Sequence, residues 1–343
     1  MSDRPRPEPF LEAELSELRE ALSGDLPSVE DLEDLLGGEG SPEDVSSETI
    51  LGRGDFPRIR PILVALAARA SGAQAGFDRE LQYAAETLYA VLVVHDLTLG
   101  REGGRRRRVA RKLLTKSASW LGRNHLTVRA MELARHAPHP DVLGEIVDTL
   151  RAFTDSQALA QGLQEGVLPT RDDWREHADS HTGALFSFCC RAGGYLGGAD
   201  TARLTALGRY GRHMGRLWHV AEDMAVLRYG QPGPYLMGRA LGGRPMLPVI
   251  AASERYADIA ERWKTLVVHP DLELAEQLAA DVLAAGGGTA AYEVMANESW
   301  RARKALRNLE NSVYRDRMER LAVALLRPAT RGSRESAGRE DVG

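Results

Sequence analysis

The chain contains 343 residues, of which 43% are hydrophobic and 6% aromatic, and its formal net charge is −5 at pH 7. A chain of this length and apolar content has enough material for one large or two ordinary domains, which excludes a disordered protein. The acidic balance argues against a general nucleic-acid binder, because such proteins carry a basic domain. Ala, Leu, Arg and Glu are abundant and strand-like alternation is scarce, so we expect an all-α fold.

Two further features concern the compartment in which the protein works. The only two cysteines, Cys189 and Cys190, are adjacent, and adjacent cysteines rarely form an unstrained disulfide with each other. The first residues are polar and lack the apolar core of a signal peptide. Later apolar runs are broken by charge within about a dozen residues, which is too short to span a bilayer. We therefore expect a cytoplasmic protein with reduced thiols and no membrane span.

The N-terminal part of the chain divides into three stretches. Residues 1–9 are polar and Pro-rich, and we expect them to form a flexible lead. From residue 10 onward leucines recur at helical spacing, which predicts a first helix. Residues 29–47 are acidic and contain Gly, Ser and Pro, which predicts a loop or short turns.

Beyond Pro61, a helical pattern of apolar residues recurs with short breaks as far as residue 327. Gly or Pro lies where each helix is expected to end. No long linker or internal repeat divides this part, so residues 10–327 are predicted to form one helical domain. The tail 328–343 is rich in Arg, Ser, Gly and Glu and is predicted to be disordered. The predicted helices are 61–72, 78–100, 107–122, 124–136, 140–164, 171–196, 200–228, 246–267, 271–285 and 288–327.

Seven short motifs follow one another along the chain. They are Phe56–Pro61, Val94–Asp96, Arg105-Arg106, Gln157, His181–Phe186, Leu217–Asp223 and Gly243–Pro248. In residue type, order and spacing this series resembles the trans-type polyprenyl diphosphate synthases. The resemblance implies a single-domain isoprenoid-synthase bundle of helices around a central cavity.

The resemblance also implies a reaction and a cofactor. Enzymes of this family condense an allylic diphosphate with isopentenyl diphosphate, and Mg²⁺ held by two Asp-Asp-x-x-Asp motifs neutralises the departing diphosphate. The first motif here reads Asp96-Leu97-Thr98-Leu99-Gly100, and the second begins Glu222-Asp223 and continues with apolar residues. Asp96, Glu222 and Asp223 are therefore the candidate Mg²⁺ ligands of a reduced site, or else carboxylates that are paired with arginine or solvated.

Three arginines match the diphosphate-binding arginines of the family, namely Arg60, Arg105 and Arg106. Guanidinium groups bind diphosphate without a metal, so affinity for a prenyl diphosphate is expected to survive. Other family positions have changed. Pro57 and His181 replace lysines and His219 replaces a glutamine, while Pro234 and Arg239 replace a lysine and an aspartate in the loop after the second motif.

Four polar residues fall at positions that border the family's cavity, which are His95, Gln157, His181 and His219. His219 and Glu222 are three residues apart on a predicted helix, a spacing that is compatible with a transition-metal site. Polar histidines packed inside a helix bundle explain the same pattern. Cys189 and Cys190 lie in a helical run beside phenylalanines and are predicted to be core residues.

Three functions remain open from the sequence. The one we favour is a catalytically impaired homologue that acts as a partner or regulatory subunit, as a homodimer or as a heterodimer with an intact polyprenyl synthase. The second is an active prenyltransferase that uses a reduced Mg²⁺ site. The third is a protein that binds a prenyl diphosphate in the cavity without chemistry.

Overall fold

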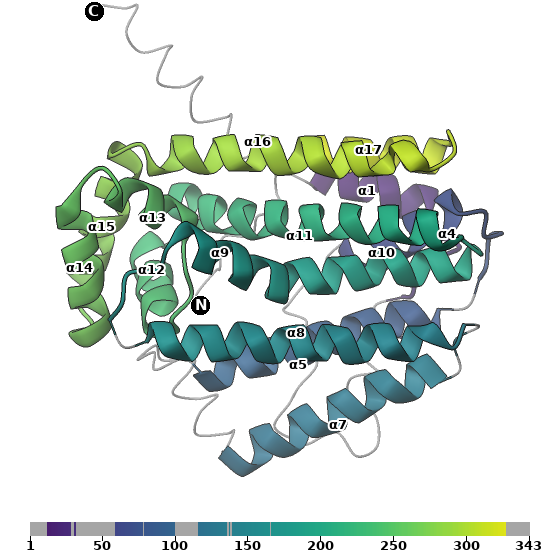
Figure 1. Cartoon of the computed structure of the whole chain (residues 1–343), viewed down its shortest axis with the longest axis horizontal. Coiled ribbons are helices and arrows are strands. Elements are labelled where there is room, and N and C mark those ends of the chain that lie inside the picture. Colours follow the sequence, from purple (N-terminus) through teal and green to yellow (C-terminus); the bar gives the residue numbers. More distant parts are fainter. Residues whose placement is uncertain are drawn as a thin grey trace, which may run out of the picture.

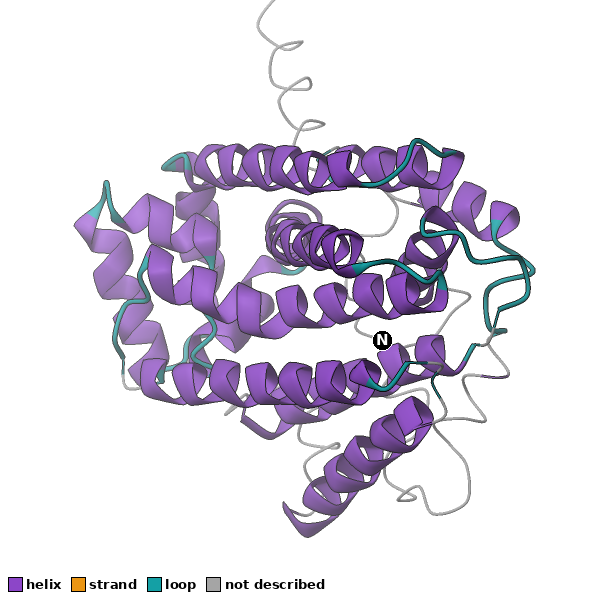
Figure 2. Ribbon diagram, turned by 45° about the vertical axis from the view of Figure 1, so that its right-hand side comes forward, coloured by secondary structure: helices purple, strands orange, loops and turns teal. Residues whose placement is uncertain are grey.

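The computed structural model describes residues 12–28, 31, 59–77, 79–99, 116–135, 137, 139–164 and 166–326. Every regular element within these ranges is a helix, and none is a strand (Figures 1 and 2). The prediction of an all-α fold is therefore confirmed. The predicted lead 1–9 and tail 328–343 lie outside the described residues.

The helices carry the labels of Figure 1. In chain order they are α1 (Glu12–Ala21), α4 (Ile59–Ala70), α5 (Glu80–Leu99), α7 (Lys116–Arg135), α8 (Asp141–Leu163), α9 (Arg171–Ala178), the π-helix η2 (Asp179–Gly183), α10 (Ala184–Leu196), α11 (Thr201–Tyr229), α12 (Pro232–Leu241), α13 (Leu247–Ser253), α14 (Ala257–Val268), α15 (Leu272–Ala284), α16 (Gly287–Ala305), the 3₁₀-helix η3 (Leu306–Asn308) and α17 (Val313–Ala324).

Helix α10 lies at the centre of the bundle, packed against α4 on one side and α11 on the other. Glycines allow both contacts to be close. A Cβ on Gly193 would lie 2.2 Å from the carbonyl oxygen of Val64 in α4, and a Cβ on Gly211 in α11 would lie 2.2 Å from the carbonyl oxygen of Phe186. No side chain larger than hydrogen fits at either position, so the absence of a Cβ sets the spacing of the three central helices.

The central helix also contributes much of the hydrophobic core. Phe186, Phe188, Cys189 and Cys190 are almost completely buried, and both cysteines are free thiols. Burial raises the pKa of each thiol, because the apolar surroundings disfavour the thiolate. These positions are core packing residues, as the sequence predicted.

Helix α11 is the longest helix in the described ranges and begins at a side-chain cap. Asp200 accepts a hydrogen bond from the backbone N–H of Arg203 at 2.8 Å, which satisfies one of the free donors at the helix start. The helix then packs along α10 and α16 and passes η2 on its way to α12. It therefore carries the second carboxylate motif from the central bundle to the group of helices at its end.

Three predicted helices are interrupted, and one helix was not predicted. The predicted helix 171–196 is divided into α9, η2 and α10, the predicted helix 246–267 is divided into α13 and α14, and the predicted helix 288–327 ends at η3 before Ser312 caps α17. Helix α12 lies in a Gly- and Pro-rich stretch that the sequence indicated as a helix breaker. Pro232 is the first residue of this helix, where proline is well tolerated because its missing N–H has no intrahelical partner.

A second, smaller core holds α12, α13, α14 and α15 together at one end of the bundle (Figure 1). Trp263 is almost fully buried there, among Leu236, Leu278 and Val282. Helix α12 packs on α15 through Gly233, whose Cβ would lie 2.3 Å from the side chain of Glu276. This small core fixes α12 beside the end of α11.

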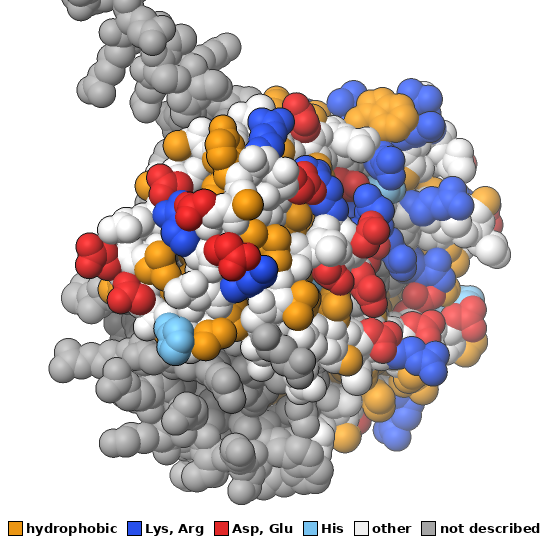
Figure 3. Space-filling model, turned by 60° about the vertical axis from the view of Figure 1, so that its left-hand side comes forward, with side chains coloured by type: hydrophobic (Ala, Val, Ile, Leu, Met, Phe, Trp, Pro, Cys, Tyr) orange, Lys and Arg blue, Asp and Glu red, His pale blue; other side chains and the backbone are white. Residues whose placement is uncertain are grey.

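None of the helices in the described ranges combines the length and the hydrophobicity needed to cross a bilayer. On the face drawn in Figure 3, acidic and basic side chains are mixed with scattered hydrophobic ones. Single exposed hydrophobic residues are normal for a folded protein surface.

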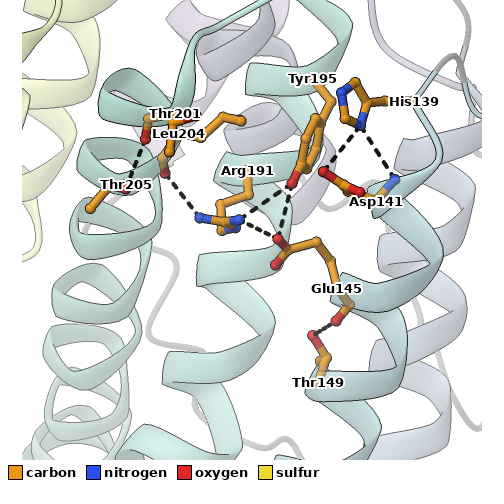
Figure 4. Close-up of polar contacts among 9 residues, drawn as sticks. All are labelled: His139, Asp141, Glu145, Thr149, Arg191, Tyr195, Thr201, Leu204 and Thr205. Carbon is orange, nitrogen blue, oxygen red and sulfur yellow. Dashed lines mark hydrogen bonds and ion pairs between the residues drawn. The ribbon is translucent and has the colours of Figure 1, made fainter.

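A polar cluster ties α8, α10 and α11 together at their edges (Figure 4). The Arg191 guanidinium forms an ion pair with Glu145, and its Nη1 donates to the carbonyl oxygen of Leu204 at 3.4 Å. The Tyr195 hydroxyl donates to Oε1 of Glu145 at 3.1 Å. One arginine of α10 thereby links its own helix to α8 and to α11.

Candidate functional site

The second carboxylate motif lies on one stretch of α11 that faces η2 and α12. Its residues His219, Glu222 and Asp223 are three and four positions apart, a spacing that places them on one side of a helix. Helix α12 brings Tyr235 and Arg239, also four residues apart, against this stretch. The candidate site is therefore built at the contact between α11 and α12.

Asp223 has no solvent exposure, and Arg239 forms a buried ion pair with it. Its Oδ1 accepts one hydrogen bond from the Tyr235 hydroxyl at 2.8 Å, a second from Nε of Arg239 at 3.1 Å and a third from Nη2 of Arg239. Asp223 Oδ2 is buried and makes no hydrogen bond to any described residue. A guanidinium thus binds one of the two oxygens of this carboxylate.

Burial and the mutual attraction of the two charges have opposite effects on the pKa values of Asp223 and Arg239. Burial raises the pKa of Asp223, and the charge and hydrogen bonds of Arg239 act against that rise. Burial alone would lower the pKa of Arg239, but the carboxylate of Asp223 outweighs this effect and the pKa is raised. Arg239 therefore remains a fixed positive charge inside the site.

Glu222 is half-buried and lies one residue before this ion pair. Burial raises the pKa of its carboxyl, while the charge of Arg239 and a hydrogen bond to Trp218 act in the opposite direction. The single charge of Arg239 is therefore shared between two neighbouring carboxylates.

A histidine group, defined by His177, His181 and His219, lines the same region. The ring centroids are 5.2 Å apart for His177 and His181, 5.4 Å for His177 and His219, and 5.9 Å for His181 and His219. His181 lies in the π-helix η2, and such widened turns are frequent at functional sites. The sequence pointed to His181 and His219 but not to His177, although His177 and His181 have the i, i+4 spacing of one helix face.

The hydrogen bonds of His219 indicate which ring nitrogen accepts. Nη2 of Arg239 lies 3.2 Å from Nε2 of His219, and Nδ1 of His219 lies 3.5 Å from the hydroxyl of Thr182. Because a guanidinium only donates, Nε2 must be the acceptor and Nδ1 carries the proton. A proton on Nε2 would face the positive charge of Arg239, so the contact favours the ring tautomer that carries its hydrogen on Nδ1.

His177 joins the group to α8. Its Nδ1 lies 2.9 Å from the hydroxyl of Ser156, which is the residue before the candidate Gln157. Gln157 itself is half-buried on α8. In the described part of the chain, no group of three or more His, Cys, Asp or Glu residues is arranged to hold a metal ion. The arrangement therefore gives no support to a transition-metal site at His219 and Glu222.

Arg60, the first of the three predicted diphosphate-binding arginines, lies on α4 and forms a two-pronged pair with Glu86 of α5. Its Nε and Nη2 donate to the two carboxylate oxygens at 2.8 and 2.9 Å, and its guanidinium carbon lies 3.6 Å above the ring of Tyr89. The Glu86 side chain is fully buried, so the pair also closes the contact between the two helices. The guanidinium is thus already engaged inside the bundle.

The remaining predicted site residues fall partly outside the described structure. His95 and Asp96 lie in helix α5, and the structure does not describe their side chains. Arg105 and Arg106 lie outside the described residues. The structure thus brings together His181, His219, Glu222 and Asp223, and it adds Tyr235, Arg239 and His177 to them.

The Mg²⁺ that the family resemblance implies requires oxygen ligands with free lone pairs. Oδ1 of Asp223 already accepts three hydrogen bonds from Tyr235 and Arg239, whereas Oδ2 accepts none from any described residue. The ion pair with Arg239 therefore engages one oxygen of this carboxylate and leaves the other with its lone pairs.

Comparisons with known proteins agree with the motifs. A family model described as polyprenyl synthetase matches residues 52–231. The chain is 24% identical over 304 residues to a short chain isoprenyl diphosphate synthase of Methanothermobacter thermautotrophicus, covering 83% of this chain and 92% of that protein. It is 27% identical over 214 residues to a (2E,6E)-farnesyl diphosphate synthase of Mycobacterium tuberculosis, covering 61% of this chain and 55% of that protein.

Solved structures show the same fold. A polyprenyl synthetase from Streptomyces coelicolor superposes with a TM-score of 0.75 at 20% identity, covering 92% of this chain and 99% of that one. A polyprenyl synthase from Caulobacter crescentus, complexed with calcium and isoprenyl diphosphate, superposes with a TM-score of 0.68 at 21% identity, covering 93% and 96%. Since the family model covers more than half of the sequence, the chain belongs to the polyprenyl synthetase family.

Proposed function

We propose that this chain binds a prenyl diphosphate without carrying out metal-dependent condensation, and that it acts as the partner or regulatory subunit of an intact polyprenyl synthase. The observation that carries the proposal is the buried ion pair between Asp223 and Arg239. Arg239 stands at a position where the resembled enzymes have an aspartate. The change from aspartate to arginine at this position therefore removes one carboxylate and places a positive charge beside a second carboxylate, that of Asp223.

The physical reason is competition for one carboxylate. A magnesium ion approaching Asp223 would meet the like charge of Arg239 at short range, in surroundings that screen it weakly. Displacing Arg239 would leave its guanidinium buried without a counter-ion, which costs several kcal/mol by analogy with other broken buried pairs. Removing one charge-stabilising group from an active site typically lowers the rate by about 10² or more.

Diphosphate binding does not require that metal. Arg105 and Arg106 keep the family's arginine pair in the sequence, and guanidinium groups bind phosphate oxygens in a two-pronged geometry. A prenyl diphosphate is therefore expected to bind through arginine rather than through magnesium.

Calorimetry with geranyl diphosphate, in magnesium buffer and in buffer containing a chelator, tests the ligand part of the proposal. We expect saturable binding with the same affinity in both buffers, and a loss of affinity in Arg106→Ala. The surface variant Arg129→Ala, which removes an arginine that pairs among the described residues with its neighbour Glu132, is the matched control. Binding that disappears in the chelator would contradict the proposal, and so would the absence of binding in both buffers.

The partner role is tested by mixing the protein with an intact polyprenyl synthase and measuring particle mass by light scattering. A mixed dimer, with product formation that depends on the ratio of the two chains, is expected. Two species that stay separate, with unchanged synthase activity at every ratio, would contradict a regulatory role.

A second candidate is an active prenyltransferase with a reduced metal set of Asp96, Glu222 and Asp223. The relative that covers 83% of this chain is named as an isoprenyl diphosphate synthase, which favours this alternative. It requires Glu222, which lies outside the Arg239 ion pair, to contribute to metal binding. Magnesium-dependent product formation that is lost in Glu222→Gln would support it, whereas activity that is unchanged in Glu222→Gln would argue against it.

A further inference from the structure

A pocket of about 170 Å³ opens at the junction of α16, η3 and α17, outside the site described above. The residues that line it are Trp300, Arg303, Lys304, Arg307, Arg315 and Glu319. Figure 1 places α17 and α12 toward opposite ends of the bundle, so this pocket does not belong to the carboxylate site. Five of its six lining residues are aromatic or positively charged.

The sequence explains how one wall of the pocket forms. Trp300, Arg303, Lys304 and Arg307 are three, four and seven residues apart, which places them along one face of α16 and its continuation into η3. All four side chains are exposed. The three cations form no ion pair with any residue in the described ranges, although they converge on the same small volume.

The opposite wall comes from α17. Arg315 is held in place by Glu319, whose Oε1 accepts from Nη2 at 3.2 Å, and by the side chain of Asn311. This arginine and Glu319 neutralise each other, which leaves the pocket with an excess of three positive charges from α16 and η3.

Trp300 gives the pocket an aromatic wall. Half of its surface, 50%, is exposed. The ammonium nitrogen of Lys304 lies 4.8 Å from its ring centroid, a cation–π contact that holds the lysine over the indole. The aromatic ring therefore positions a cation at the pocket wall.

Helix-end electrostatics account for part of this arrangement. Basic residues in the last turn of a helix interact favourably with the helix dipole, which explains Arg303 and Lys304. It does not explain Arg307, which lies beyond α16 in η3. Three like charges converging on one pocket repel one another, and an anion bound between them would relieve that repulsion.

We propose that this pocket binds a phosphate-bearing anion, with Arg303, Lys304 and Arg307 contacting the phosphate oxygens and Trp300 forming one wall. Guanidinium and ammonium groups are the usual protein ligands of phosphate, and a volume of about 170 Å³ is small enough to select a compact anion rather than a large substrate. The phosphate comes either from a free diphosphate or from a lipid headgroup. The proposal is independent of the function proposed above.

Tryptophan fluorescence tests the site directly. The purified full-length protein is titrated with inorganic diphosphate, with phosphatidylglycerol vesicles and with phosphatidylcholine vesicles. Trp300→Phe identifies the part of the signal that belongs to this pocket, because the other four tryptophans, Trp120, Trp174, Trp218 and Trp263, are unchanged in that variant. Lys304→Gln removes one pocket cation, and Lys264→Gln makes the same change on the exposed face of α14 as the matched control.

We expect a saturable Trp300 signal whose affinity falls roughly fivefold in Lys304→Gln and is unchanged in Lys264→Gln. A response to diphosphate identifies a free phosphate compound as the source, and a response confined to phosphatidylglycerol vesicles identifies a lipid headgroup. The proposal is overturned by no response to either, by equal responses to the two kinds of vesicle, or by equal weakening in the two lysine variants.

Discussion

Replacing Arg239 by methionine tests the electrostatic account of the candidate site. Methionine keeps much of the volume of the arginine stem but removes the charge, so Asp223 keeps only the Tyr235 hydroxyl as a partner. Removing one partner of a buried ion pair typically destabilises a protein by about 3–5 kcal/mol. Asp223 has no solvent exposure and Arg239 is 7% exposed, so we expect Arg239→Met to fall in this range at neutral pH.

The pH dependence has a defined sign. Burial already raises the pKa of Asp223, and the variant lacks the guanidinium that opposes this rise. A carboxyl whose pKa is higher in the folded than in the unfolded state contributes most stability below its unfolded pKa and loses that contribution as the pH rises through the folded value. The deficit of Arg239→Met should therefore shrink when the pH is lowered from 7 toward 4.

Urea denaturation followed by circular dichroism measures both effects. The double variant Asp223→Leu/Arg239→Met should recover most of the lost stability, because an apolar pair needs no counter-ion. The control Arg262→Met, which removes an arginine from a surface pair with Asp258 and Asp281, should cost about 1 kcal/mol or less. A cost for Arg239→Met as small as that of the control would refute the reasoning.

Three further changes and one titration test other parts of the account. Glu298→Gln should destabilise the protein by about 1–3 kcal/mol at pH 7. Although burial acts in the opposite direction, contacts with His213 and Arg216 lower the pKa of Glu298 in the folded protein. The loss of stability should therefore become smaller in unfolding curves as the pH drops below the pKa of this glutamate in the unfolded chain. Arg60→Ala leaves the buried carboxylate of Glu86 without its two-pronged partner and should cost about 3 kcal/mol in urea denaturation, with Arg60→Lys intermediate. Gly193→Ala should lower the melting temperature by several degrees because its Cβ meets an α4 carbonyl, whereas Gly162→Ala, with open space around it, should leave the melting temperature unchanged or raise it. Added magnesium chloride should not raise the melting temperature of the protein beyond the effect of the same ionic strength of sodium chloride.

The main fold could be predicted because its helices carry strong signals. The sequence placed a helix at 200–228, and α11 spans Thr201–Tyr229, because apolar periodicity and an aspartate cap act together there. Helix α12 could not be predicted, since Pro232, Gly233 and Gly238 read as breakers. This helix is stabilised by packing against α15, and a pattern of neighbouring residues in the sequence does not reveal such a contact.

Some residues of the candidate site could be predicted from the sequence, whereas the contacts between them could not. Family-like motifs identified Glu222 and Asp223, and the altered position Arg239 was visible in the sequence as well. The ion pair between Arg239 and Asp223 joins residues sixteen positions apart on different helices, and it depends on the turn between them. His177 was missed because it lies outside the motifs, although its i, i+4 relation to His181 was a usable signal.

Condensation activity is the most direct test of the central proposal, which is that Arg239 pairs with Asp223 in place of magnesium and that the chain therefore does not catalyse condensation. Purified protein is incubated with magnesium, labelled isopentenyl diphosphate and allylic diphosphates of several lengths, beside an intact synthase as the positive control. We predict no product extractable into organic solvent from this protein, and full product formation in the control. Labelled prenyl product formed by this chain alone, and abolished by a chelator, would contradict the account.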